Sequence, residues 1–229
     1  MSKKIPNVVI IDYGMGNIFS VKSACDRVGL TATISQNPDE LYDSDGIIIP
    51  GVGAFKDAMS SLDNLGLSAA IRDFSKSNKT ILSLCLGMQL LFTESYEFGW
   101  HKGLDIISGD VVKLNAHTIG SRNYKVPHIG WNSLKRVNSN TMESRDLWEE
   151  SLLDGLPDSV YMYFLHSFYV RPEDSGLFLS TTDYGNNVFC SGLKKDNLFA
   201  FQFHPEKSGD SGLHIYKNLT DYMSLLRNE

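Results

Sequence analysis

Short runs of apolar residues alternate with amphipathic segments through the first 95 residues. Each run is followed by a turn or by apolar positions spaced three and four apart, which is typical of βαβ units around a parallel sheet. Residues 18–28, for example, predict a helix that stops at Gly29. The pattern predicts an α/β fold. The predicted strands are 8–11, 31–34, 46–49 and 80–84, and the further predicted helices are 55–62, 67–74 and 86–93.

From Gly109 onward the chain consists of short β-branched and aromatic segments separated by Asn, Gly and Ser. These segments predict antiparallel strands or extensions of the sheet. The polar residues 138–149 predict a loop with a short helix, and 212–226 a final helix. No repeat or linker interrupts the chain, so we expect a single domain over residues 1–229. The predicted strands are 111–114, 160–165, 178–182, 188–193 and 198–203.

The composition narrows the function classes. A formal net charge of −6 argues against a broad nucleic-acid surface. No apolar run approaches the roughly 20 residues that span a bilayer, and the first run stops at Asp12, too soon for a signal peptide. The chain has three scattered cysteines and no Cys-x-x-Cys motif: Cys25, Cys85 and Cys190. Such a set argues against a disulfide framework, so we expect the protein in a reducing cytoplasm. The six histidines lack metal-ligand spacing, so we expect no metal and no cofactor.

The cysteine in LSLCLGMQ lies between the predicted strand 80–84 and the helix after it. A buried structural cysteine is one interpretation, because free cysteine is among the most buried residue types. A tight strand-to-helix turn would instead expose Cys85 above a helix N-terminus, which favours the thiolate. Gly87 supplies a small residue that such a turn needs. Cys85 is therefore a candidate nucleophile.

His204 and Glu206 follow the last predicted strand in FQFHPEKS. Pro205 ends the strand and keeps His204 extended. Residues two apart in extended chain project to the same side, so the carboxylate can orient the imidazole that takes a thiol proton. A polar turn without chemistry is the alternative for this segment alone. Together with a cysteine at a turn, the pair predicts a base for a nucleophile.

The segment IIIPGVGAF ends a predicted strand in Pro-Gly-x-Gly. Its backbone N–H groups at Gly51, Val52 and Gly53 are candidate oxyanion donors, with the Leu86 amide as a further donor. An ordinary glycine-rich turn is the alternative. The segment is not a phosphate loop, because no Gly-Lys-Ser/Thr follows it.

These three segments, in this order, resemble the class I (triad-type) glutamine amidotransferases. Three further motifs resemble the glutaminase subunit of imidazole glycerol phosphate synthase: IDYGMGNIFSV at 11–21, VPHIGWN at 126–132 and YFLHSFYV at 163–170. The resemblance implies a flavodoxin-like three-layer sandwich, with a mostly parallel central sheet and antiparallel extensions in the C-terminal half.

The resemblance also implies the chemistry. Cys85 would attack the carboxamide of L-glutamine, His204 would shuttle the proton and Glu206 would orient His204. Ammonia would leave a γ-glutamyl thioester, which water would hydrolyse to glutamate. Without the resemblance, His166 would be a rival base and Glu97 a surface acid. The positions that match the glutamine-binding residues of the family are Gln89, Glu97, Ser167 and Phe168.

In this family the ammonia passes to a (βα)₈-barrel cyclase subunit, which combines it with PRFAR to give imidazole glycerol phosphate and AICAR. The resemblance therefore implies a heterodimer with that cyclase. From the residues alone, PHIGW predicts a rigid loop whose tryptophan is either an interface anchor or a core side chain. The positions that match the barrel-facing surface of the family are Asn17, His128, Trp131 and Asn132.

Two positions depart from the family pattern. Ser83 stands where the family usually has glycine, and Ile107-Ser108-Gly109 replaces an expected Pro-Gly pair. Added atoms crowd a nucleophile turn, so the serine requires a slight shift. The departures admit an alternative function, in which a paralogue supplies ammonia for amidination of a surface-polysaccharide sugar.

Two other classes of protein are disfavoured. A cysteine peptidase or chaperone-type relative on the same scaffold would share the turn cysteine, but it would not explain His-Pro-Glu together with Gln89. A regulatory module that has lost turnover would typically lack a triad residue, and all three are present.

Overall fold

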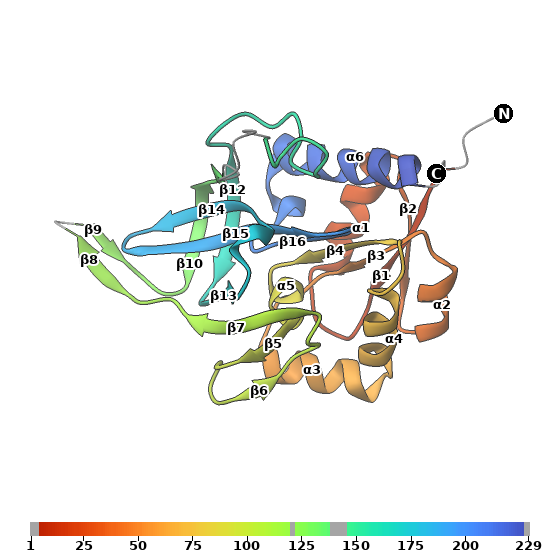
Figure 1. The fold of residues 1–229 in the computed structure, drawn as a ribbon, viewed down its shortest axis with the longest axis horizontal. Helices are drawn as coiled ribbons and strands as arrows, with labels where there is room; N and C mark the ends of the chain where they lie inside the picture. The colour runs from red at the N-terminus through yellow and green to blue at the C-terminus, as the bar shows by residue number, and fades with distance from the viewer. Residues whose placement is uncertain (1–4, 120–121, 138–145, 227–229) are drawn as a thin grey trace.

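The computed structural model describes residues 5–119, 122–137 and 146–226. An eight-stranded sheet crosses the molecule between two layers of helices (Figure 1). Its strands, in spatial order, are β11 (Lys135–Arg136), β14 (Phe178–Tyr184), β15 (Asn187–Lys195), β16 (Leu198–Phe201), β4 (Thr80–Leu84), β3 (Gly46–Ile49), β1 (Asn7–Ile11) and β2 (Thr31–Ser35).

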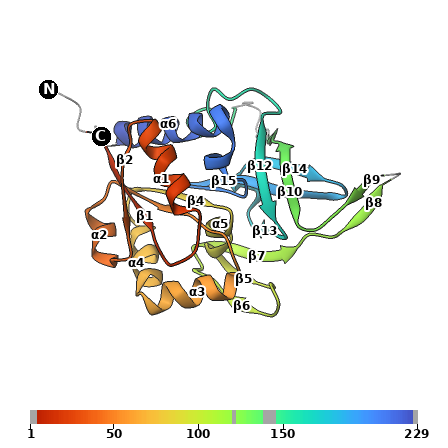
Figure 2. The ribbon, with the colours of Figure 1, turned by 180° about the vertical axis from the view of Figure 1, so that it is seen from behind.

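The sheet is parallel from β16 to β2 and antiparallel from β16 to β11. The predicted α/β sandwich with antiparallel C-terminal extensions is confirmed. Figure 2 shows the same layers from behind. The helices are α1 (Ile18–Arg27) and α6 (Gly209–Leu226) on one face, α3 (Phe55–Asn64), α4 (Leu67–Phe74) and α5 (Leu86–Leu90) on the other, and the short α2 (Pro38–Asp43).

Both faces of the central strands are buried, which explains why these strands are continuous apolar runs and do not alternate with polar residues. In β1, Val8 and Ile10 pack into the core under α1 and α6, whereas Val9 and Ile11 pack into the core with α3, α4 and α5. Alternate residues of one strand therefore stabilise two separate cores.

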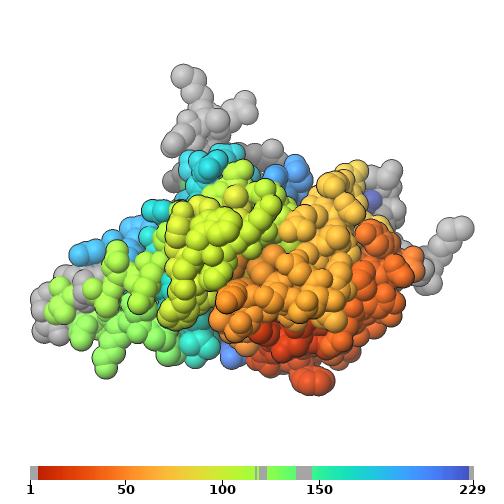
Figure 3. Space-filling view, turned by 90° about the horizontal axis from the view of Figure 1, so that it is seen from below, coloured from red at the N-terminus to blue at the C-terminus, as the bar shows by residue number. Residues whose placement is uncertain are grey.

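Smaller sheets flank the main one. The segment of β5 and β6, in yellow-green, lies beside α3 and α4, in orange and gold (Figure 3). A separate hairpin of β8 and β9 projects away from the main sheet (Figure 1). The strands are β13 (Phe168–Pro172), β7 (Ile107–Lys113), β5 (Phe92–Ser95) and β6 (His101–Lys102) in one sheet, β10 (His128–Ser133) and β12 (Tyr161–His166) in a second, and β8 (His117–Ile119) and β9 (Arg122–Tyr124) in a third.

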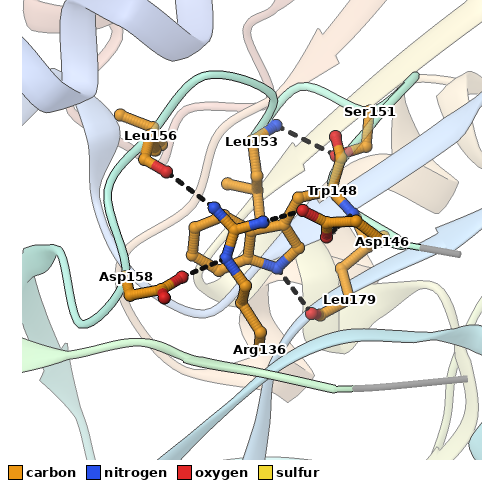
Figure 4. Close-up of polar contacts among 8 residues, drawn as sticks. All are labelled: Arg136, Asp146, Trp148, Ser151, Leu153, Leu156, Asp158 and Leu179. Atoms are coloured by element: carbon orange, nitrogen blue, oxygen red, sulfur yellow. Dashed lines mark hydrogen bonds and ion pairs between the residues drawn. The ribbon is translucent and has the colours of Figure 1, made fainter. Parts of the chain in front are cut away.

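Arg136 anchors the loop that leads into β12 (Figure 4). Its guanidinium stacks 4.2 Å from the ring of the fully buried Trp148 and forms ion pairs with Asp146 and Asp158. The indole Nε1–H of Trp148 donates to the carbonyl of Leu179 on β14 at 2.8 Å. This cluster ties the loop to the main sheet and so positions β12.

Several predicted elements need correction. The helix predicted over 86–93 ends at Leu90, because Phe92 and the residues after it pair with β7 as strand β5. The predicted PHIGW loop is strand β10, and the strand predicted to reach Phe203 ends at Phe201. Helix α2 was missed although Asn37-Pro38 signals it: the Asn37 side chain accepts from the Asp39 amide at 3.1 Å. The predicted loop at 138–149 lies outside the described residues up to 145.

Ser83 fits within β4 and pairs regularly with β3 and β16, but its buried hydroxyl has no hydrogen-bond partner among the described residues. We expect Ser83→Ala to raise the free energy of unfolding by about 1 kcal/mol, because an unpaired buried hydroxyl is destabilising. Urea unfolding measures this. Ser44→Ala is the matched control and should have the opposite sign, because the buried hydroxyl of Ser44 donates to the Leu41 carbonyl at 2.8 Å. A loss of stability in both variants would contradict the prediction.

Candidate active site

Cys85 occupies the turn between β4 and α5 with a left-handed backbone, at φ 53° and ψ −107°. Residues other than glycine rarely adopt this conformation, so the turn is strained. The helix that follows packs closely on β3: a Cβ at Gly87 would lie 2.1 Å from the carbonyl oxygen of Ile49. The Cys85 N–H donates to the Phe201 carbonyl at 2.7 Å, which ties the turn to β16. The structure thus places the cysteine at the strand-to-helix turn that the sequence predicts.

His204 and Glu206 lie beside this turn and their side chains are 2% exposed. The distance from His204 Nδ1 to Glu206 Oε1 is 2.8 Å, whereas Nε2 is buried without a hydrogen-bond partner among the described residues. Burial by itself lowers the pKa of His204, but its interactions with Cys85 and then with Glu206 offset this and raise the pKa to about 10. The imidazolium form of His204 is therefore favoured.

The predicted oxyanion segment lies against the first turn of α5. Val52 and Gly53 line one cleft with Cys85 and Leu86. Gly51 lies behind them, where a Cβ would be 2.7 Å from the Leu86 Cβ. Leu86 begins α5, and the N–H groups of a first helical turn have no intrahelical acceptor. These four residues therefore meet next to the sulfur, as an oxyanion hole requires.

The cleft above Cys85 has a volume of about 260 Å³, and next to it is a wider hollow of about 740 Å³. Glu97, Ser167 and Phe168 line both spaces, and Gln89 lines the inner one. Glu97 Oε2 accepts from the Phe55 N–H at 2.5 Å, so this carboxylate also caps α3. Burial raises the pKa of Glu97, although this hydrogen bond opposes the shift. All four predicted glutamine-binding residues thus border one space.

His166, the alternative candidate for the catalytic base, is unsuited to that role because both of its ring nitrogens are hydrogen-bonded. Its Nδ1 lies 2.9 Å from the Phe168 carbonyl, which can only accept, so Nδ1 carries the proton. Its Nε2 lies 3.1 Å from His128 Nδ1 and must therefore accept from it. Burial lowers the pKa of His166 to about 3 and that of His128 to about 4. Both rings are neutral structural groups at pH 7.

Of the four residues predicted for the partner surface, Asn17 precedes α1, and the other three lie on opposite faces of β10. Trp131 is 55% exposed, whereas Asn17 and Asn132 are partly exposed. His128 is only 3% exposed, stacked on Tyr184 and Phe164, so its predicted place on the partner surface needs correction. The reason is the two-residue period of a strand, which turns His128 inward and Trp131 outward.

Sequence reasoning missed two buried residues of the site. Tyr13 donates its hydroxyl to the Pro50 carbonyl at 2.6 Å, which fixes the start of the oxyanion segment. Burial, and after it the charge of Cys85, raises the pKa of Tyr13 far above its usual value. Gln202 lies 3.6 Å from the Cys85 sulfur. Both stand inside motifs already noted, but no residue pattern indicates which way their side chains point.

The described part of the chain contains no helix long and apolar enough to cross a membrane. Within those same residues, no three His, Cys, Asp or Glu side chains are grouped as metal ligands would be.

A strained cysteine and a buried His–Glu pair, beside a cleft lined by a glycine-rich segment, are the features expected of a class I glutamine amidotransferase. The family model "Glutamine amidotransferase class-I" matches residues 9–221, and the chain belongs to this family. Solved structures agree in fold: a glutamine amidotransferase (TM-score 0.66, 18% identity, 91% of this chain and 96% of that one) and PurLQS from Thermotoga maritima (TM-score 0.64, 16% identity, 96% and 99%).

Within the family, the chain belongs with the HisH subunits of imidazole glycerol phosphate synthase. It is 40% identical to HisH of Chlorobaculum tepidum over 94% of this chain and 100% of that protein. It is 42% identical to HisH of Syntrophotalea carbinolica (93% and 99%) and 42% identical to HisH of Aquifex aeolicus (92% and 94%).

Acid should destabilise the fold through His128 and His166. Unfolding frees both rings to bind protons below about pH 6.5, whereas the lowered pKa values keep them neutral in the folded chain. The contribution of the two neutral histidines to the free energy of unfolding is thus present above pH 6.5 and is lost as the pH falls toward 4. We expect urea unfolding at pH 7 and pH 5 to differ by about 1–2 kcal/mol per histidine. His204 has the opposite sign: its raised pKa keeps it protonated in the folded chain, whereas the unfolded ring loses its proton above about pH 6.5, so its contribution to stability is full below pH 6.5 and falls as the pH rises toward 10.

The variants for this prediction are His128→Asn and, as a control without a titratable group, Phe19→Ala. His128→Asn should flatten the dependence of stability on pH by about one proton between pH 5 and 6.5. Phe19→Ala removes an 83% exposed side chain of α1 and should keep the native slope. An unchanged slope in His128→Asn would contradict the assignment.

Proposed function

We propose that this chain hydrolyses L-glutamine to glutamate and ammonia at Cys85 and passes the ammonia to a (βα)₈-barrel cyclase subunit. The heterodimer would make imidazole glycerol phosphate and AICAR from PRFAR in histidine biosynthesis. The observation that carries the proposal is the strained Cys85 beside the buried His204–Glu206 pair in a cleft lined by the oxyanion segment. The HisH relatives, about 40% identical over nearly their whole length, support the choice of pathway.

In the first half-reaction the Cys85 thiolate attacks the side-chain carboxamide carbon of glutamine. The raised pKa of His204 supplies an imidazolium, which gives its proton to the leaving nitrogen so that ammonia departs. The backbone amides of Val52, Gly53 and Leu86 would stabilise the oxygen that becomes negative, since these residues line the cleft together with Cys85. The products of this step are ammonia, a γ-glutamyl thioester on Cys85 and a neutral His204.

In the second half-reaction the neutral His204 removes a proton from water as the water attacks the thioester carbon. Collapse of the tetrahedral intermediate breaks the carbon–sulfur bond, releases glutamate and restores the thiolate–imidazolium pair. Glu206, 2.8 Å from Nδ1, holds the ring in one orientation through both halves. Glu97 is the acid placed to attract the α-ammonium group of the substrate, because it lies at the boundary of the cleft and the hollow.

The cyclase would dock on the outward face of β10 and β12. Ile129 is 59% exposed, Trp131 55% and Tyr161 60%, and the rings of Trp131 and Tyr163 meet edge to face at 6.1 Å. Large exposed aromatic side chains at the centre of a patch are typical anchors of protein interfaces. We call these four residues the aromatic face.

The aromatic face adjoins the triad through the backbone. The His204 N–H donates to the Tyr163 carbonyl at 2.9 Å. The Ser208 hydroxyl donates to the His204 carbonyl at 2.6 Å and accepts from the Tyr163 N–H at 3.0 Å. A partner bound at the aromatic face would therefore lie close to the atoms that release ammonia, which suits direct transfer.

The glutaminase is tested by Cys85→Ala in the assembled complex. We expect glutamine-dependent turnover to fall by at least about 10³-fold, because the nucleophile is lost, while turnover with added ammonium salt remains. Cys190→Ala is the control, since Cys190 is buried at 2% exposure with its thiol 3.4 Å from the Gly192 carbonyl. Persistent glutamine use by Cys85→Ala would remove Cys85 as the nucleophile.

The partner surface is tested by Trp131→Ala. Because the indole is half exposed, the melting temperature should change little, whereas the dissociation constant for the cyclase should rise about 10- to 100-fold. Trp100→Ala is the matched control: this indole is 61% exposed and lies outside the aromatic face. If the native and Trp131→Ala chains bind the cyclase with equal affinity, the aromatic face is not the docking surface.

An assay of glutamate release with different partners separates the histidine pathway from sugar amidination. Glutamate release stimulated by the histidine-pathway cyclase, with a PRFAR analogue present, would support the proposal. Stimulation by a different cyclase-like partner alone would assign the chain to the paralogous role with the same chemistry.

A further inference from the structure

Gln202 is a fully buried amide in the turn after β16, and it takes no part in the two half-reactions of the triad. Its Nε2 lies 3.6 Å from the Cys85 Sγ, a hydrogen-bond distance for the large sulfur atom. Its Oε1 lies 3.2 Å from Gln89 Nε2, and Gln89 Nε2 lies 2.9 Å from the Phe168 carbonyl oxygen. Three contacts thus join the backbone of β13 to the sulfur.

The direction of this series of hydrogen bonds is set at its Phe168 end. A backbone carbonyl can only accept, so Gln89 must present its NH₂ group to Phe168. The same NH₂ group faces Gln202, which must therefore present its oxygen. The NH₂ group of Gln202 is then left to face Cys85. Exchange of the oxygen and nitrogen of either amide would bring two acceptors or two donors together, so the orientation is fixed by chemistry.

Two uncharged groups near Cys85 Sγ favour opposite protonation states. The Leu165 carbonyl, 3.6 Å away, accepts from a neutral thiol. The Gln202 N–H donates to the sulfur, and a hydrogen bond to an anion is stronger than one to a neutral acceptor. Desolvation disfavours a thiolate on a residue that is only 5% exposed, so a fixed donor matters more here than it would in water.

We propose that Gln202 is a catalytic residue that donates a hydrogen bond to the Cys85 thiolate, and that Gln89 is a positioning residue that holds Gln202 in the donating orientation. This inference rests on the proposed function, because it deepens the chemistry of the same nucleophile. It also gives Gln89 a role inside the protein in addition to its predicted contact with glutamine.

The test is alkylation of Cys85 by iodoacetamide in the purified chain, followed by mass spectrometry between about pH 6 and 9. Cys25 and Cys190 are buried, and burial raises the pKa of both thiols, to about 12 for Cys25, so they should react slowly. Gln202→Met keeps an unbranched side chain of similar size and removes the donor. We expect the pH midpoint of alkylation to rise by about one unit, so that alkylation at pH values below the native midpoint slows about tenfold.

Glutaminase assays of the complex should agree, with kcat lower by about tenfold and KM little changed, because glutamine does not need this amide for binding. Gln202→Glu is the second variant if Gln202→Met does not fold: it keeps an acceptor for Gln89 and should slow alkylation at least as much. Gln89→Met should give a smaller effect, since Gln202 would keep its donor and lose only its fixed orientation. Asn218→Leu removes a partly buried amide on α6, which does not line the cleft, and should alkylate like the native chain.

Equal alkylation rates in native and Gln202 variants would overturn the role of Gln202 and leave Cys85 as the nucleophile. A native chain whose Cys85 resists alkylation throughout the pH range would overturn this inference and the proposed glutaminase together. The two failures are therefore distinguishable.

Discussion

The close contact between α5 and β3 is the constraint on which the candidate active site depends. With only a hydrogen on Gly87, the helix begins directly against the Ile49 carbonyl, and the chain enters the helix through a left-handed residue at Cys85. That turn costs roughly 1–3 kcal/mol in backbone strain. The buried parallel strands on both sides hold it in place, so the cores stabilise the nucleophile geometry.

Around this turn, polar groups are buried in an apolar interior, and backbone carbonyls determine how they are oriented. The Phe168 carbonyl accepts from both Gln89 and His166. One contact leads through Gln202 to the sulfur, and the other leads through His128 to β10. Since a carbonyl is an acceptor only, the donor and acceptor roles of every later member follow from it. A buried network with a single consistent orientation gives the site one well-defined geometry.

Strand β12 connects the candidate active site to the exposed aromatic face. Its inward residues carry the neutral His166, its outward residues belong to the aromatic face, and its backbone binds His204. The candidate active site and the proposed docking surface therefore share one strand of six residues.

The sequence by itself determined the alternation of strands and helices, the parallel half of the sheet and the positions of Cys85, His204 and Glu206, because these follow from local periodicity and from short motifs. Only the tertiary structure decided that Phe92 leaves the helix for a strand, that His128 turns inward while Trp131 turns outward, and that Gln202 reaches the sulfur. The physical reason is that strand pairing, burial and hydrogen-bond direction are set by residues distant in sequence, such as Cys85 and Gln202, which are 117 positions apart.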